Sequence, residues 1–164
     1  IMIKGMRYYF FWIALLLIFI YLLQVLFPQI TDFFILNDRA VENLEFWRYV
    51  TALFLHGSIE HLMFNLFALL LFGFMLEKLI GSSAFLQIYL FSGIIGNLIA
   101  LNFYNSSLGA SGAIYGVIGA LTVLQPLMMV WAFGMIIPLF IASLLWVTAD
   151  IFRILGIFGE TNIG

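Results

Sequence analysis

The first apolar run, residues 8–27, restricts the possible folds of this chain more than any other feature. Its twenty residues include no charged side chain, and the run stops at Pro28. A helix rises about 1.5 Å per residue, so about 20 apolar residues cross the hydrocarbon core of a bilayer. A signal peptide would have a shorter apolar core and a small-residue cleavage site after it, which this sequence lacks. The run therefore predicts a first transmembrane helix.

The composition agrees with a membrane protein. Hydrophobic residues make up 65% of the 164 residues, charged residues only 9%, and the mean hydropathy is +1.19. A soluble domain would be about half apolar and about a quarter charged. The net charge of -2, without any basic run, argues against a nucleic-acid partner. Cysteine is absent, so disulfides and thiolate metal sites are excluded. The length predicts a single membrane domain over residues 1–164.

Four more apolar runs predict further transmembrane helices, at residues 59–79, 85–104, 111–125 and 128–149. Pro138 falls inside the last run, where we expect it to kink the helix. The third run contains Gly93 and Gly96, a spacing of small residues that lets another helix approach closely. The fourth run is rich in small residues and is expected to be buried among other helices; these residues are Gly112, Ala113, Gly116, Gly119 and Ala120. The predicted fold class is an all-α polytopic membrane protein.

Basic residues near the start of the chain predict its orientation. Lys4 and Arg7 favour a cytoplasmic N-terminus, because positive residues flank the cytoplasmic ends of membrane helices. The segment 28–58 is then an external loop. Its aromatic and basic cluster at residues 46–49 is expected to lie in the membrane interface. Glu77-Lys78 returns to the cytoplasmic side, where we expect both side chains to be solvated or to snorkel toward the interface.

A serine in Gly109-Ala110-Ser111-Gly112 lies at the start of the fourth predicted helix. Free backbone N–H groups and the positive end of the helix dipole are available there, which suits a nucleophile whose intermediate carries an oxyanion. The glycines at 109 and 112 allow a sharp turn and a close approach of another chain. The structural alternative is an N-cap serine beside a packing glycine.

His61 and Asn65 are four residues apart, so they share one face of the second predicted helix. Both can donate hydrogen bonds toward a single point. They could instead bond to neighbouring helices, as polar groups in membrane helices often do. A metal site is disfavoured, because two histidines, no cysteine and an asparagine make a poor ligand set. We expect His56 to lie at the interface, with its hydrogen bonds formed by the loop.

Taken together, these motifs resemble the rhomboid family of intramembrane serine proteases. The resemblance runs in order over roughly residues 45–160 and is carried by Trp47-Arg48, His61-x-x-x-Asn65, Glu77-Lys78 followed by Gly81-Ser82, and Gly109-Ala110-Ser111-Gly112 followed by Tyr115. It implies a six-helix bundle that encloses a water-accessible cavity open to the outside. It also implies an enzyme without a cofactor that cleaves transmembrane segments of other proteins in the bilayer. The expected location is a prokaryotic inner membrane.

The resemblance also implies roles for individual residues. Ser111 would be the nucleophile, and His61, Asn65 and the backbone N–H of Ser111 would form the oxyanion hole. Tyr115 would pack against the catalytic histidine, and together with Gly109 and Gly112 it would form the wall of the site. From its position alone, one turn after Ser111, Tyr115 could equally be a core residue.

The sequence departs from the family pattern in one respect. The family's general base is a histidine in an Ala-His pair on a sixth helix, and residues 159–164 look like the approach to that helix. We therefore expect five of six helices here, with the sequence cut short of the histidine. Two other functions remain open: an inactive relative that binds membrane helices, and a small transporter or channel. The absence of an internal repeat and of charges inside the spans disfavours the transporter.

Overall fold

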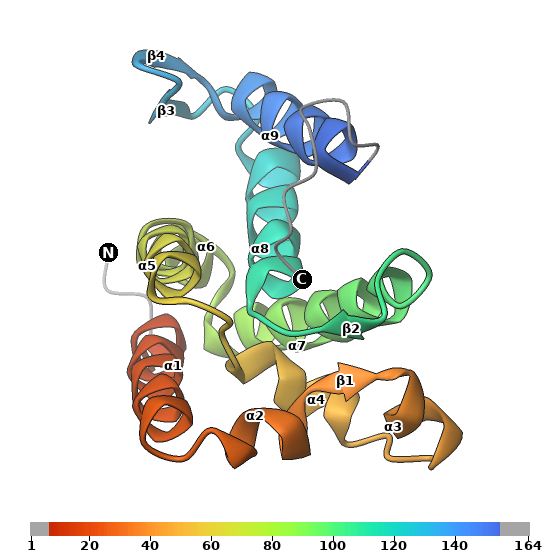
Figure 1. Ribbon diagram of the computed structural model, residues 1–164. Coiled ribbons are helices and arrows are strands. Elements are labelled where there is room, and N and C mark those ends of the chain that lie inside the picture. Colours follow the sequence, from red (N-terminus) through yellow and green to blue (C-terminus); the bar gives the residue numbers. More distant parts are fainter. Residues whose placement is uncertain (1–6, 155–164) are drawn as a thin grey trace. The chain divides into compact units, whose positions relative to one another are not determined.

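A computed structural model of the chain describes residues 7–154, and most of these are helical (Figure 1). The chain divides into two compact units, residues 1–117 and 118–164, which are described separately below. The expected approach to a sixth helix, at residues 159–164, lies outside the described residues. The single domain over 1–164 stays a prediction.

The first unit holds the long apolar helices. They are α1 (Tyr9–Leu26), a second helix formed by α5 (Ile59–Ala68), the π-helical turn η2 (Leu69–Gly73) and α6 (Phe74–Ile80), then α7 (Ser82–Ala100) and the start of α8 (Ser111–Leu124). Three of them, Tyr9–Leu26, Ile59–Ile80 and Ser82–Ala100, are long and apolar enough to cross a membrane. This arrangement confirms the predicted polytopic helical class.

Short elements connect these helices. Between α1 and α5 lie α2 (Gln29–Phe34), β1 (Leu36–Asn37), α3 (Asp38–Glu42), α4 (Arg48–Thr51) and η1 (Ala52–Phe54). Strand β2 (Ser106–Ser107) pairs antiparallel with β1, so the segment before α8 is joined to the segment between the first two spans. Asn97 of α7 adds to this junction, donating to the Tyr49 carbonyl at 2.9 Å and accepting from the Ser107 hydroxyl at 2.9 Å.

Close contact between α7 and α8 depends on glycine. A Cβ on Gly96 would lie 3.1 Å from Cα of Gly112, and a Cβ on Gly93 would lie 3.1 Å from Cβ of Ala113. The predicted packing of small residues is therefore confirmed for these positions. Gly119, however, is exposed, and a Cβ there would meet no atom within 4 Å. The prediction that Gly119 is buried among helices is wrong.

Glu77 also differs from its predicted environment. Its carboxylate is completely buried and accepts hydrogen bonds from the backbone N–H groups of Tyr9 (3.0 Å) and Phe10 (2.9 Å), and from the Ser82 hydroxyl. The two backbone donors lie at the start of α1, where the first N–H groups have no partner inside the helix. The prediction that Glu77 is solvated is therefore wrong. Lys78 is exposed, as expected.

The second unit contains the largest correction to the predicted helices. Residues 129–138 form a β-hairpin, β3 (Met129–Ala132) paired with β4 (Met135–Pro138), and α9 (Leu139–Ile154) begins only after it (Figure 1). The predicted helix over 128–149 is therefore wrong in its first half. Phe133 and Gly134 both have positive φ, 54° and 80°, which closes a two-residue turn. Pro138 precedes α9 instead of kinking it.

Candidate active site

Ser111 is the first residue of α8 and is exposed. The turn before it contains Gly109 with φ of 115°, a conformation that side chains disfavour. The backbone N–H of Gly109 donates to the Ala52 carbonyl at 2.9 Å. Together with the β1–β2 pair, this bond fixes the turn against the segment between the first two spans. The serine is thus presented at a helix N-terminus by an anchored turn.

His61 lies directly against this turn. Its helix, α5, begins after the N-cap Ser58, whose hydroxyl accepts from the backbone N–H of His61 at 3.2 Å. A Cβ on Gly109 would lie 2.6 Å from Cε1 of His61 and 3.0 Å from its Nε2. The structure therefore brings the His61 imidazole next to the turn that leads into Ser111, although Ser111 lies 50 positions after His61 in the sequence.

Asn65 lies one turn further along α5 and is 6% exposed. Its Nδ2 amide is buried and has no hydrogen-bond partner among the described residues. A buried donor without a partner costs about 1–3 kcal/mol, so most native structures avoid it. A buried donor of this kind has a function if it donates a hydrogen bond to a negative charge that develops during a reaction.

The ring of His56, in the loop just before α5, contacts the ring of His61. The two rings are 5.1 Å apart between centroids and meet edge to face at 68°. His56 is 2% exposed. Burial, with a contribution from His61, lowers the pKa of His56 to about 4, and a hydrogen bond with the Phe54 backbone works against this shift. Phe54 belongs to the same loop, so the interfacial His56 satisfied by its loop stays a prediction.

The backbone of His56 is held by Gln24 of α1, a residue that sequence reasoning missed. The Gln24 amide accepts from the His56 N–H at 3.0 Å and donates to the His56 carbonyl at 3.2 Å. It also donates to the Thr31 hydroxyl at 2.9 Å. The signal in the sequence was available, because Gln24 is the only side-chain amide in the run 8–27.

The remaining predicted site residues lie on α8. Gly112 packs against α7, and Tyr115 is one turn beyond Ser111 and 37% exposed. No group of three His, Asp or Glu residues that could hold a metal ion occurs within the described residues.

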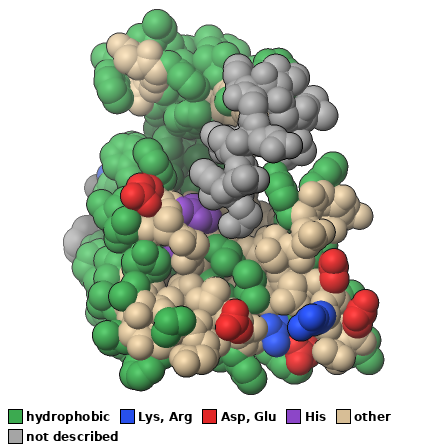
Figure 2. Space-filling view, in the orientation of Figure 1, with side chains coloured by type: hydrophobic (Ala, Val, Ile, Leu, Met, Phe, Trp, Pro, Cys, Tyr) green, Lys and Arg blue, Asp and Glu red, His purple; other side chains and the backbone are tan. Residues whose placement is uncertain are grey.

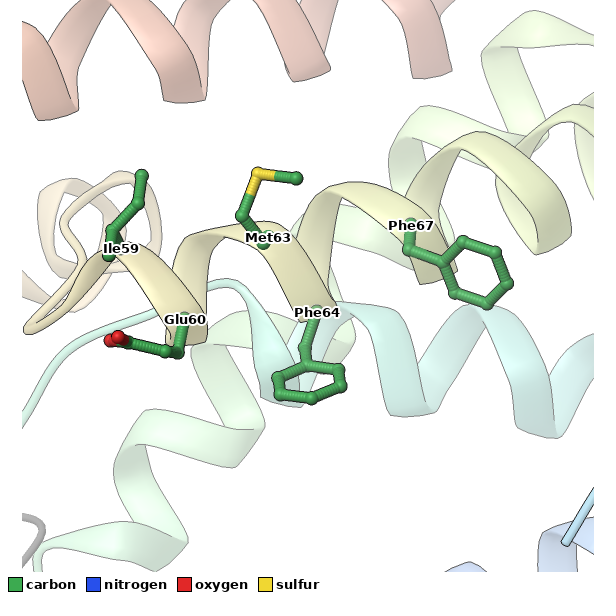
Figure 3. A pocket seen from close by; sticks show the side chains of 5 residues that line it. All are labelled: Ile59, Glu60, Met63, Phe64 and Phe67. Carbon is green, nitrogen blue, oxygen red and sulfur yellow. The ribbon is translucent and has the colours of Figure 1, made fainter.

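An open pocket of about 400 Å³ runs along α5, lined by Ile59, Glu60, Met63, Phe64 and Phe67 (Figure 3). This lining includes neither Ser111, His61 nor Asn65. All five side chains come from α5, and four of them are apolar. The pocket is therefore a hollow in the apolar surface of one helix, separate from the polar groups near Ser111.

Part of this sequence is similar to known proteins. Residues 43–162 match the Rhomboid domain family. The rhomboid protease GluP of Bacillus subtilis is 44% identical over 87 residues, which cover 52% of this chain and 17% of GluP. Rhomboid-like protease 3 of Toxoplasma gondii is 42% identical over 84 residues, covering 50% of this chain and 32% of that protein. An inactive relative, Inactive RHOMBOID-like protein 8 of Arabidopsis thaliana, is 38% identical over 82 residues, covering 49% and 23%.

The matched part spans less than a third of the length of each of these three relatives. Their names include both proteases and an inactive protein, so family membership by itself does not decide activity. The family match covers well over half of this chain, and the apolar helices are those of a multi-pass integral membrane protein. The chain belongs to the rhomboid family.

Proposed function

We propose that this protein is an intramembrane serine endopeptidase that cleaves transmembrane segments of other membrane proteins. Ser111 attacks the scissile carbonyl as the base takes its proton; the peptide C–N bond breaks, the amine fragment leaves with that proton, and water hydrolyses the acyl-enzyme to a carboxylic acid and free Ser111. His61, Asn65 and the backbone N–H of Ser111 donate hydrogen bonds to the oxyanion. The general base is the family's sixth-helix histidine, which is not among the residues of this sequence. The proposed location is a prokaryotic inner membrane, with the N-terminus in the cytoplasm.

One observation carries this proposal: within the described residues the Nδ2 donor of Asn65 has no hydrogen-bond partner, and it lies one helical turn from an imidazole that touches the Gly109 turn. A purely structural asparagine in a membrane helix would bond to a neighbouring helix. Asn97 of α7 does so, since both its amide oxygen and its amide nitrogen are hydrogen-bonded. Asn65 and Asn97 thus differ in the way expected for a binding donor and a structural one.

The test begins with the intact mass and C-terminal sequence of the protein expressed from its natural reading frame. Cleavage of a reporter transmembrane segment is then measured for the wild type and for Ser111→Ala, alongside Ser83→Ala as a matched control at the start of α7. The proposal predicts cleavage by the wild type and the control, and none by Ser111→Ala. Cleavage that survives Ser111→Ala would overturn it.

A second candidate is a non-catalytic rhomboid that binds membrane helices. It is favoured by one observation: a relative that is named inactive, Inactive RHOMBOID-like protein 8 of Arabidopsis thaliana, is 38% identical over 82 residues. A serine-directed phosphonate separates the two candidates, since it labels Ser111 only when a base activates the hydroxyl.

A further inference from the structure

A second polar site lies in the segment between the first two spans, away from Ser111. It is a pocket of about 330 Å³ whose walls come from α2, β1, α3 and the start of α4. The polar lining consists of Asp32, Asn37, Arg39, Asn43, Glu45 and Arg48. The proposed protease mechanism uses none of these residues.

Arg48 forms a fixed wall of this pocket. Its Nη1 donates to the carbonyls of Asp32 (2.8 Å) and Ile35 (3.0 Å), and its Nε lies 2.6 Å from Oε2 of Glu45. No hydrogen bond within the described residues uses Nη2. The guanidinium is therefore ordered before any ligand arrives, which lowers the entropy lost on binding.

The other two charged groups of the pocket, Asp32 and Arg39, have no partner among residues 7–154. The side chains of Asp32 and Arg39 are exposed, and neither forms an ion pair or hydrogen bond in the described part of the chain. Two guanidinium groups and two carboxylates line one pocket, so its formal charge is zero. Figure 2 shows side chains of both signs gathered over this part of the surface. A ligand that carries both signs itself fits this pattern.

A purely anionic ligand fits less well. Asp38 and Glu42 of α3 lie beside the pocket and add two negative charges to its surroundings. A metal cation also fits less well, because the two guanidinium groups would repel it. Charge complementarity therefore favours a zwitterion over either simple ion.

The surroundings of the pocket point to a lipid. Exposed apolar side chains flank it on the same segment; they are Phe33, Leu44, Phe46 and Trp47. The guanidinium of Arg48 lies over the Phe33 ring, 5.8 Å from its centroid. The segment joins the end of α1 to the start of α5, so it lies at the level where a membrane helix meets the headgroups. A polar pocket beside exposed aromatic groups at this level faces phospholipid headgroups.

We propose that this pocket binds the phosphoethanolamine headgroup of a zwitterionic phospholipid. The phosphate accepts hydrogen bonds from Arg39 and from Nη2 of Arg48, and the ammonium donates to the carboxylates of Asp32 and Glu45. Ethanolamine is preferred over choline because its ammonium has N–H donors, whereas a trimethylated nitrogen has none. The lipid would hold the segment between α1 and α5 in the interface.

The test measures retained lipid on the chain in detergent by native mass spectrometry. Phosphatidylethanolamine, phosphatidylcholine and phosphatidylglycerol with identical acyl chains are added in turn. We expect phosphatidylethanolamine to bind about 3- to 10-fold more tightly than the other two, a typical effect for one or two charged hydrogen bonds at a partly exposed site. Asp32→Asn and Arg39→Gln should each remove most of this preference. Glu60→Gln, which changes an exposed residue of α5 outside this pocket, should leave it unchanged.

Equal retention of phosphatidylethanolamine by the wild type, Asp32→Asn and Arg39→Gln would overturn the proposal. Tighter binding of phosphatidylglycerol would also overturn it, because it would show an anion site only. If either variant fails to fold, the ranking of the three lipids on the wild type decides. The measurement is repeated with Ser111→Ala, where the same ranking is expected, so its outcome is independent of the proteolytic proposal.

Discussion

The imidazole of His61 and the α-carbon of Gly109 are so close that a Cβ at 109 would lie 2.6 Å from His61 Cε1. Contacts under 3.0 Å are not tolerated by real Cβ atoms, so only glycine permits this packing. The positive φ of Gly109 independently favours glycine at this position. The Gly109 turn, which leads into Ser111, thus packs closely against His61. His61 is the residue expected to stabilise the oxyanion.

Gly109→Ala should therefore displace His61 or unfold the turn. We expect a loss of about 1–3 kcal/mol in the free energy of unfolding, measured in detergent, and no labelling by a serine-directed phosphonate. The matched control is Gly81→Ala, because Gly81 also has positive φ (84°) but a Cβ there would meet no atom within 4 Å. Gly81→Ala therefore adds the backbone strain of an alanine at positive φ but no steric clash with a neighbouring side chain. Equal losses in the two variants would show that the His61 contact is unimportant.

Asn65→Ala should lower the cleavage rate but leave the free energy of unfolding nearly unchanged. Removing a buried donor that has no partner costs little or nothing in unfolding free energy. If Nδ2 stabilises the oxyanion, the cleavage rate should fall by about 10²-fold, with His61 and the backbone N–H still donating. Asn97→Ala is the comparison, since it breaks two hydrogen bonds and should lower the melting temperature. A marked loss of stability in Asn65→Ala would point to a structural role instead.

Glu77→Gln tests the buried carboxylate that holds the start of α1. An amide cannot accept all three hydrogen bonds, and its NH₂ group would face a backbone donor. We expect the free energy of unfolding to drop by about 1–3 kcal/mol. Lys78→Gln, the next residue and exposed, should change it by less than about 0.5 kcal/mol. Thermal unfolding of both variants in the same detergent gives the comparison, and similar midpoints would contradict the assigned role of Glu77.

His56 should make the protein sensitive to acid. Its pKa is about 4 when folded and near 6.5 when unfolded, so the unfolded state binds the proton first. Stability is then complete above pH 6.5, falls as the pH decreases from 6.5 to 4, and levels off below 4. The loss is on the order of 3 kcal/mol, at about 1.4 kcal/mol per pKa unit.

His56→Phe should flatten this part of the stability curve, since an apolar ring keeps the edge-to-face contact with His61 and does not titrate. Carboxylates titrate in the same range, so the relevant quantity is the difference between the wild-type and variant unfolding free energies at each pH. A difference that stays constant from pH 7 to pH 4 would show that His56 is not held neutral in the folded state.

The sequence alone was sufficient to locate most of the helices. Length and hydropathy are local properties, so α1, the helix from Ile59 to Ile80, α7 and α8 were all predicted near their observed bounds. The close packing at Gly96 and Gly112 was also predictable, because only small residues allow helix backbones to approach so closely. The roles of Ser111, His61 and Asn65 came from motif spacing and resemblance, and they stay predictions.

The hairpin at residues 129–138 could not be separated from a helix by hydropathy. An apolar strand pair and an apolar helix have similar composition, and the burial of Val130 and Ala132 alternates over only four residues. The Phe133-Gly134 turn was the one local signal, but phenylalanine with positive φ is uncommon and was not anticipated.

Sequence by itself determined that this chain is a membrane protein built from apolar helices, because the bilayer requires long apolar runs whatever their partners are. Only the tertiary structure decided which residues the polar side chains contact. Glu77 binds the start of α1, Gln24 holds the backbone of His56, and His61 rests on Gly109. Each of these pairs joins residues at least 32 positions apart, so no local pattern reports them. Their positions are set by how the helices pack, which is a property of the whole fold.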